Sequence, residues 1–263
     1  MFSMTEKSEA LRDLLAGYPG ALVAFSAGVD STMLLAACVE ALGAERVRAV
    51  TAISSSYPAA ENREAEEIAA QLGVERVLLE TREIELEGYR QNGMDRCYYC
   101  KGELFQRMRE AVRAGDLPDW PIFYGAILDD LGDYRPGAKA ASEAGVLAPL
   151  QDEGWSKDDV RAWSRTRNLP TSEKGSFACL SSRIPTGTAI DPDLLLRVER
   201  AEEWFRRRNF RQFRVRHHGD LARIEVDKDE IPRLLGDEGD GLVETLQALG
   251  WSKVCVDLAG FRR

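Results

Sequence analysis

The stretch ALVAFSAGVDS (residues 21–31) decides the fold. Its first five residues form a continuous apolar run, which is typical of a strand that is buried on both faces. A turn containing Gly28 follows, and residues 32–42 have the composition of a helix. The stretch therefore predicts a strand, a tight loop and a helix, the repeating unit of α/β proteins.

The same alternation continues along the chain. Further apolar runs predict strands at 47–53, 74–79, 122–125 and 146–148, and the segments between them predict helices at 59–72, 101–113 and 157–166. Strands that are covered by helices on both faces indicate an α/β fold with a doubly wound parallel sheet.

The periodicity fails between about residues 169 and 191, where prolines and glycines predict a linker. Beyond it we expect a helix on which Leu194, Val198, Ala201 and Phe205 share one apolar face. An antiparallel strand pair at 211–217 and 221–226, a helix at 241–249 and a strand at 253–258 should follow. We therefore predict two domains, 1–180 and a smaller α+β domain at 181–263.

The composition narrows the class of protein. Of the 263 residues 44% are hydrophobic and 30% charged, which suits a globular fold, and the net charge of −9 argues against nucleic acid as a partner. We find no apolar run approaching the ~20 residues of a membrane helix and no secretory signal, so we expect a cytoplasmic protein with no membrane partner. Most soluble oligomers are symmetric homo-oligomers, and we expect such an assembly here.

The loop after the first strand has the chemistry of an anion site. Gly28 permits unusual dihedral angles and close approach of the backbone, Ser26 and Ser31 offer hydroxyls, and the amides that begin the next helix favour negative charge. Asp30 would repel phosphate unless it caps the helix or holds Mg²⁺. An ordinary capped turn is the alternative, because Ser, Gly and Asp are common in turns.

The five cysteines are an odd number in a chain for which we expect no secretory signal, so we interpret them as thiols or metal ligands and not as a disulfide framework. Cys97 and Cys100 precede the helix expected at 101, and Cys179 lies in the linker. With His217 or His218 the three could bind zinc; they could also form a redox disulfide or hold an iron–sulfur cluster with one open iron. A closed zinc knuckle at Cys97 and Cys100, with Cys179 as a buried thiol, is as consistent with the spacing.

Six arginines lie between residues 206 and 216. A run of charge is usually a solvated surface. Arg214 and Arg216, however, alternate on one strand, so they share a face on which two guanidinium groups could bind a phosphate.

Longer motifs give a resemblance. SAGVDS (26–31) resembles the SGGxDS signature of PP-loop ATP pyrophosphatases, with Ala27 in place of the second glycine. Together with DRCYYCK (95–101), DDLGDYRPG (129–137), CLSSRIPTG (179–187) and RVRHHGD (214–220), the chain resembles the LarE family, ATP-dependent sulfur insertases of nickel-pincer nucleotide biosynthesis. Two stretches depart from the family pattern, Gly125-Ala126-Ile127 and residues 171–174.

The resemblance implies ATP, Mg²⁺ and a [4Fe-4S] cluster as cofactors and a pyridinium mononucleotide as the small-molecule substrate. It implies the following site residues: for ATP and Mg²⁺, Ser26, Gly28, Val29, Asp30, Ser31, Thr51, Lys101 and Gly125; for the substrate phosphate, Arg214, Arg216 and Glu225; for catalysis, Asp30, Cys179, Arg183 and Glu202; for the cluster, Cys97, Cys100 and Cys179.

It also implies a reaction. ATP would adenylate a carboxylate of pyridinium-3,5-biscarboxylic acid mononucleotide, and sulfur would then displace AMP. The three cysteines favour delivery of sulfide from the cluster, with sacrifice of Cys179 as the alternative. A PP-loop tRNA thiolase and an adenine-nucleotide sensor without catalysis are the competing interpretations.

Overall fold

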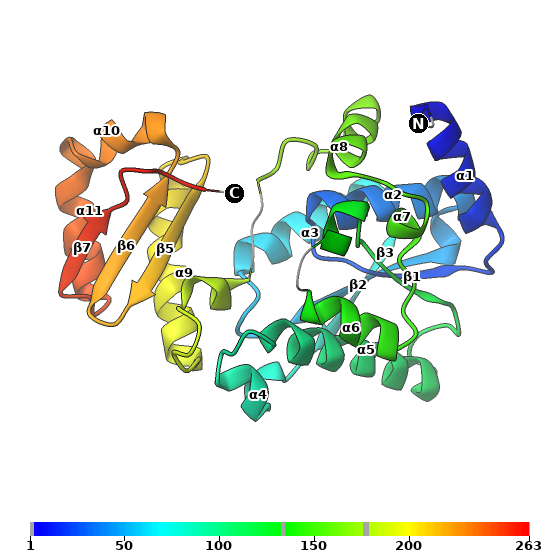
Figure 1. The fold of residues 1–263 in the computed structure, drawn as a ribbon, viewed down its shortest axis with the longest axis horizontal. Coiled ribbons are helices and arrows are strands. Elements are labelled where there is room, and N and C mark those ends of the chain that lie inside the picture. The colour runs from blue at the N-terminus through cyan, green and yellow to red at the C-terminus, as the bar shows by residue number, and fades with distance from the viewer. Residues whose placement is uncertain (1–2, 133–134, 176–178, 263) are drawn as a thin grey trace. The chain divides into compact units, whose positions relative to one another are not determined.

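The computed structural model describes residues 3–132, 135–175 and 179–262 (Figure 1). The chain divides into two compact units, and each is described by itself. The first consists of Met1–Leu86 and Met94–Lys174, and the second of Glu87–Gly93 and Gly175–Arg263.

The first unit is a parallel sheet with helices on both faces. Its elements are α1 (Met4–Ala16), β1 (Ala21–Ala24), α2 (Val29–Leu42), β2 (Val47–Ile53), α3 (Ala59–Gln71), β3 (Glu75–Glu80), α5 (Arg96–Ala114), β4 (Ile122–Tyr124), α6 (Pro136–Glu143), α7 (Pro149–Asp152) and α8 (Lys157–Thr166). The strand order β3-β2-β1-β4, all parallel, confirms the predicted doubly wound sheet.

Helix α2 is buried along most of its length because it lies between the sheet and an outer helical layer. Its apolar side chains join one core with residues of α1, α3 and α8, whereas α5 and α6 cover the other face with a second core (Figure 1). The central strand β1 pairs with both β2 and β4. The loop that follows β1 therefore lies between the ends of β2 and β4 at the carboxyl edge of the sheet.

Two predictions about this unit are wrong in detail. The helix expected at Lys101 begins at Arg96, so Cys97 and Cys100 lie inside it. Packing of α5 against α6, with Tyr98 donating to Glu143 Oε2 at 2.6 Å, stabilises a turn that its own residues do not strongly favour. The strand expected at 146–148 is a single bridge between Leu147 and Phe123.

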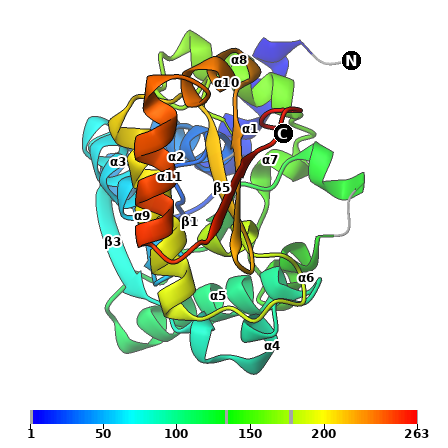
Figure 2. The ribbon, with the colours of Figure 1, turned by 90° about the vertical axis from the view of Figure 1, so that its left-hand side faces the viewer.

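The second unit is a smaller α+β fold. It contains α4 (Glu87–Arg90), α9 (Pro192–Arg207), β5 (Phe213–His218), β6 (Leu221–Val226), α10 (Ile231–Leu234), α11 (Asp237–Ala248) and β7 (Lys253–Val256). β5 and β6 are antiparallel as predicted, β7 joins parallel to β6, and α9 and α11 pack beside this sheet (Figure 2).

A short segment from the N-terminal half of the chain, Glu87–Gly93, belongs to this second unit. Within Glu87–Gly93 the side chains of Tyr89 and Asn92 are fully buried, and Tyr89 shares a 2.5 Å hydrogen bond with Ser181. The Asn92 amide donates to the carbonyls of Pro185 and Thr188 at 2.9 and 3.0 Å. The segment after Cys179 is therefore held by residues that precede it by about ninety positions.

None of the helices in the described part of the chain is both long and apolar enough to cross a membrane.

Candidate functional site

The loop after β1 turns at Ala27. This alanine has φ 54°, in the left-handed region that favours glycine, whereas Gly28 has φ −79° and ψ 166°, which any residue adopts. The expectation that Gly28 supplies unusual dihedral angles is therefore wrong. The Ala27 side chain is fully buried in the core, and this burial offsets the backbone cost of about 1–2 kcal/mol.

The start of α2 presents unpaired donors at the carboxyl edge of the sheet. Within the described residues no side chain caps this helix, and its first backbone bond runs from Thr32 N to Gly28 O at 2.9 Å. The backbone amides of Val29, Asp30 and Ser31 come before that first bond, so the hydrogen-bond ladder of the helix does not use them. Ser26 Oγ and Ser31 Oγ lie 3.1 Å apart and share a hydrogen bond. Amides and hydroxyls gathered at a helix N-terminus suit a phosphate group.

Asp30 has a partner that the sequence did not reveal. Lys157 Nζ, at the start of α8, donates to both Asp30 oxygens at 2.7 Å. Both side chains are partly exposed. A partly exposed carboxylate beside a phosphate site fits Mg²⁺, which commonly uses one or two carboxylates together with phosphate oxygens.

Lys174 is a second lysine that sequence analysis missed. Its side chain is 9% exposed, and its ammonium donates to the carbonyl of Ala27 at 3.1 Å and to Glu61 and Glu64 at 2.6 and 2.7 Å. It therefore ties the left-handed turn of the loop to helix α3. Lys174 lies in the stretch 171–174 that departs from the LarE pattern.

Gly125, directly after β4, packs against the first turn of α2. A Cβ atom here would lie 2.9 Å from Ser31 N and 3.0 Å from the carbonyl carbon of Asp30, so backbone would have to move. The site requires glycine for this close approach and not for its dihedral angles.

We expect Gly125→Ala to weaken ATP binding by about 10- to 100-fold, because it displaces the amides that would face the phosphates. Titration calorimetry with ATP and Mg²⁺ measures this. Gly241→Ala is the matched control, because its new Cβ meets no atom within 4 Å. Equal ATP affinity for Gly125→Ala and the native chain would contradict this assignment of the nucleotide site.

The other two expected nucleotide residues, Thr51 and Lys101, belong to elements outside the phosphate loop. Thr51, on β2, is buried and its hydroxyl accepts from Arg76 Nε at 3.1 Å. Lys101, on α5, places its ammonium about 6 Å from the ring centres of Phe105 and Tyr124. Their contact with ATP stays a prediction.

Cys97 and Cys100 lie one turn apart on α5, so their side chains share a face of the helix. Cys97 is exposed and Cys100 partly exposed. Gly137 at the start of α6 packs beside them, since a Cβ there would lie 3.0 Å from Lys101 Cγ and in ordinary contact with Cys97 O at 3.5 Å. Two accessible thiols at this spacing have the donor chemistry of an iron–sulfur cluster or of zinc.

Cys179 belongs to the second unit, where it precedes a short 3₁₀ turn, Leu180–Arg183. Arg183 Nη1 donates to its carbonyl at 3.1 Å. Arg183 also binds Glu202 through two bonds of 2.8 and 3.1 Å, and both side chains are 1% exposed. In the structure this buried pair supports the segment of Cys179. The catalytic role that the resemblance implies for Arg183 and Glu202 stays a prediction.

Arg214 and Arg216 share one face of the β5–β6 ribbon, as the alternation predicted, and Glu225, the cross-strand partner of Arg214, lies on the same face. Glu225 Oε1 accepts from Arg216 at 2.5 Å and from Arg223 at 2.8 Å. Burial, together with the charges of Arg183 and Arg216, lowers the pKa of Arg214. Arg223 was missed because its cross-strand pairing with Arg216 depends on the register of the hairpin.

The two histidines lie at the end of β5. His217 is buried, and its Nδ1 accepts from Trp251 Nε1 at 3.1 Å. Burial, followed by the charge of Arg197, lowers the pKa of His217. Its bond to Trp251 places His217 in the core of the second unit.

We expect the stability that neutral His217 contributes to be present above pH 6.5 and lost as the pH falls from 6.5 towards its lowered pKa, because only the unfolded chain binds the proton readily in that range. The difference in unfolding free energy between the native chain and His217→Gln should therefore shrink between pH 7.5 and 5.5, measured by urea denaturation. A difference that is constant with pH would contradict this. Comparison with His218→Gln separates the two histidines, since burial lowers the pKa of His218 too.

In residues 3–132, 135–175 and 179–262 no cluster of three or more His, Cys, Asp or Glu side chains is arranged to hold a metal ion. Cys97 and Cys100 lie in the first unit and Cys179 in the second. Their convergence on one metal stays a prediction.

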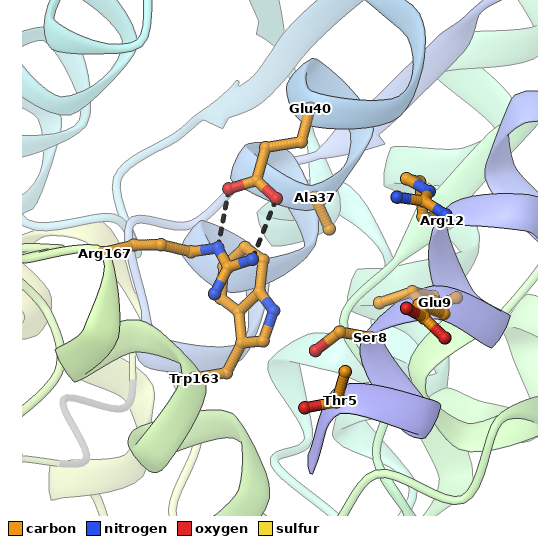
Figure 3. Close-up of a pocket in the computed structure, with 9 residues that line it drawn as sticks. Thr5, Ser8, Glu9, Arg12, Ala37, Glu40, Trp163 and Arg167 are labelled. Carbon is orange, nitrogen blue, oxygen red and sulfur yellow. Dashed lines mark hydrogen bonds and ion pairs between the residues drawn. The ribbon is translucent and has the colours of Figure 1, made fainter.

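One pocket of the first unit lies among α1, α2 and α8 (Figure 3). Arg167 crosses it, bonded to Glu40 at 2.6 and 3.1 Å and stacked 3.7 Å from the ring centre of Trp163. Glu40 lies near the C-terminal end of α2, about 15 Å along the helix from Asp30. This pocket is therefore separate from the phosphate loop.

The fold and the loop define the class: the first unit is a PP-loop, Rossmann-like nucleotide-binding domain. In agreement, the family model described as NAD synthase matches residues 6–113. An uncharacterized protein of Synechocystis is 38% identical over 260 residues, 98% of this chain and 96% of its own length. Another, of Methanocaldococcus jannaschii, is 26% identical over 184 residues, covering 70% of this chain and 71% of its own.

A third relative carries a functional name. The pyridinium-3,5-bisthiocarboxylic acid mononucleotide synthase of Lactiplantibacillus plantarum is 34% identical over 262 residues, 100% of this chain and 94% of its own length. The chain belongs to the LarE family of PP-loop ATP-dependent sulfurtransferases.

Proposed function

We propose that this enzyme adenylates a carboxylate of pyridinium-3,5-biscarboxylic acid mononucleotide and converts it to a thiocarboxylate, as a step of nickel-pincer nucleotide synthesis. The observation that carries the proposal is the similarity to the named synthase, which is 34% identical over 262 residues. The matched range covers both the phosphate loop and the segment of Cys179. A cytoplasmic location and a homo-oligomeric assembly stay predictions.

Activation by ATP solves a chemical problem. A carboxylate resists attack by a nucleophile because the group that leaves its carbon would be an oxide ion, which is a very poor leaving group. Its oxygen attacks the α-phosphorus of ATP, the bond to the β-phosphate oxygen breaks, and pyrophosphate leaves. The donors at the start of α2, with Asp30 holding Mg²⁺, would bind the phosphates that depart. Sulfur then attacks the acyl carbon and AMP leaves.

On the substrate side, Arg214 and Arg216 would bind the mononucleotide phosphate. They lie on one face of the β5–β6 ribbon, and Glu225 fixes the Arg216 guanidinium. A charge-assisted, bidentate contact of arginine with phosphate is the usual means of such recognition.

For the source of sulfur we propose a [4Fe-4S] cluster held by Cys97, Cys100 and Cys179. When bound, such a cluster would supply sulfide from its open iron. In the alternative, Cys179 Sγ attacks the acyl carbon, its Cα proton is lost and its Cβ–S bond breaks, which leaves dehydroalanine and a thiocarboxylate. Cys179 is partly exposed, as either route requires.

The test combines product analysis with metal analysis. Anaerobically purified protein, incubated with ATP, Mg²⁺ and the biscarboxylic mononucleotide, should release pyrophosphate and yield a product in which oxygen is replaced by sulfur. Iron and sulfide should be present in the native protein and reduced in Cys100→Ser. Absence of pyrophosphate release would overturn the function. Absence of iron, with stoichiometric zinc, would overturn the cluster.

A further inference from the structure

Lys157 occupies both oxygens of the carboxylate that Mg²⁺ would need. Its ammonium lies 2.7 Å from each oxygen of Asp30, which stands in the first turn of α2. The two residues are separated by 127 positions, so α8 brings this charge to the phosphate loop. Mg²⁺ and the ammonium therefore compete for one carboxylate.

The backbone of Lys157 is anchored, and its side chain is partly exposed. Lys157 N donates to Asp129 Oδ2 at 2.9 Å, and Ser156 and Asp159 form a reciprocal cap at the start of α8. The Lys157 side chain is 39% exposed. A long, partly solvated side chain on an anchored helix can exchange one partner for another without a change of fold.

The charges at the phosphate loop indicate which group the Lys157 ammonium would bind after it leaves Asp30. An unpaired Asp30 would repel the phosphates that the amides of α2 attract, and pairing with Lys157 suppresses this repulsion. Mg²⁺ carries two charges and prefers carboxylate oxygen, so it displaces an ammonium from a partly exposed pair. The released ammonium can then donate to phosphate oxygens that are bound at the same loop.

We propose that Lys157 is a phosphate-binding residue of the nucleotide site, paired with Asp30 in the structure described above and transferred to the triphosphate of ATP when Mg²⁺ takes the carboxylate. The inference rests on the proposed function only in requiring that ATP binds at this loop.

The experiment measures ATP binding by titration calorimetry over a range of Mg²⁺ concentrations, for the native protein, Lys157→Met and Lys157→Arg. At saturating Mg²⁺ we expect Lys157→Met to weaken ATP binding by about 10- to 100-fold, the loss of one charge-assisted hydrogen bond. The Mg²⁺ concentration at half-saturation should fall by about 2- to 5-fold, because the competing ammonium is gone. Lys157→Arg should retain most of the ATP affinity.

Lys7→Met is the matched control. Lys7 also forms an ion pair with α8, through Asp159 at 2.7 Å, and does not contact the phosphate loop in any described bond. We expect it to change neither quantity. Unfolding free energies of all variants establish that each is folded.

The opposite shifts in ATP affinity and Mg²⁺ requirement distinguish a binding role from a structural one. Unchanged ATP affinity and unchanged Mg²⁺ requirement in folded Lys157→Met would overturn the inference and leave the proposed function intact. Conversely, failure of the native protein to release pyrophosphate with the proposed substrate would overturn that function, whereas the binding measurements would still decide the role of Lys157.

Discussion

Replacing Arg183 with methionine is expected to lower the free energy of unfolding by about 3–5 kcal/mol, the usual cost of removing one partner of a buried ion pair. Glu202 would keep its carboxylate at 1% exposure without the two bonds from Arg183. The cost is large because the backbone amide of Val215, which donates to Glu202 Oε1 at 3.1 Å, does not replace the opposite charge that the buried carboxylate loses. Equilibrium denaturation with urea measures it.

Two further variants separate the charge effect from loss of packing. Arg183→Met combined with Glu202→Met should recover much of the stability, because removal of both charges leaves no isolated ion. Arg165→Met breaks the exposed pair with Glu173 and should change the free energy of unfolding only slightly, because water screens exposed charges. A loss of that small size in Arg183→Met would show that the pair is not buried as described.

The second large effect concerns the transfer of sulfur. Cys179→Ala should reduce thiocarboxylate formation by at least about 100-fold while pyrophosphate release continues, because only the second half of the reaction needs the thiol. Product analysis by mass spectrometry and a pyrophosphate assay measure the two halves separately. Cys255→Ala, which removes another partly exposed thiol of the same unit, serves as the control and should retain both.

Two additional variants distinguish the sources of sulfur. If a cluster delivers it, Cys97→Ala and Cys100→Ala should lose thiolation as Cys179→Ala does. If Cys179 is sacrificed, both should retain a single turnover, after which the protein has lost the mass of H₂S from Cys179. Full thiolation by Cys179→Ala would contradict both routes.

Local patterns predicted most of the fold. The bounds of β2 (Val47–Ile53) and α8 (Lys157–Thr166) agree with the sequence, because an apolar run and a capping box at Ser156 are local signals. The start of α5 was placed five residues late, since its first turn is stabilised by contacts with α6. Tertiary contacts of that kind leave little trace in the residues of the turn itself.

The candidate site was predicted less completely. The sequence indicated the phosphate loop and the arginine face, because spacing along one strand or one turn fixes them. It could not indicate Lys157 or Lys174, whose partners lie 127 and 110 to 147 positions away. For Arg183 and Glu202 the resemblance implied a catalytic role, which stays a prediction. Sequence composition could not reveal that the two side chains form a buried ion pair.

The excursion Glu87–Gly93 has a consequence for how the protein is made. These residues leave the ribosome long before Gly175–Arg263, yet the buried side chains of Tyr89 and Asn92 bond to Ser181, Pro185 and Thr188 in that later part of the chain. Domains generally fold as units during synthesis, so the excursion must remain solvated until translation is nearly complete. A C-terminal fragment cut at the linker would lack the amide that holds Pro185 and Thr188. Separate expression of the second unit would therefore require grafting of this heptapeptide.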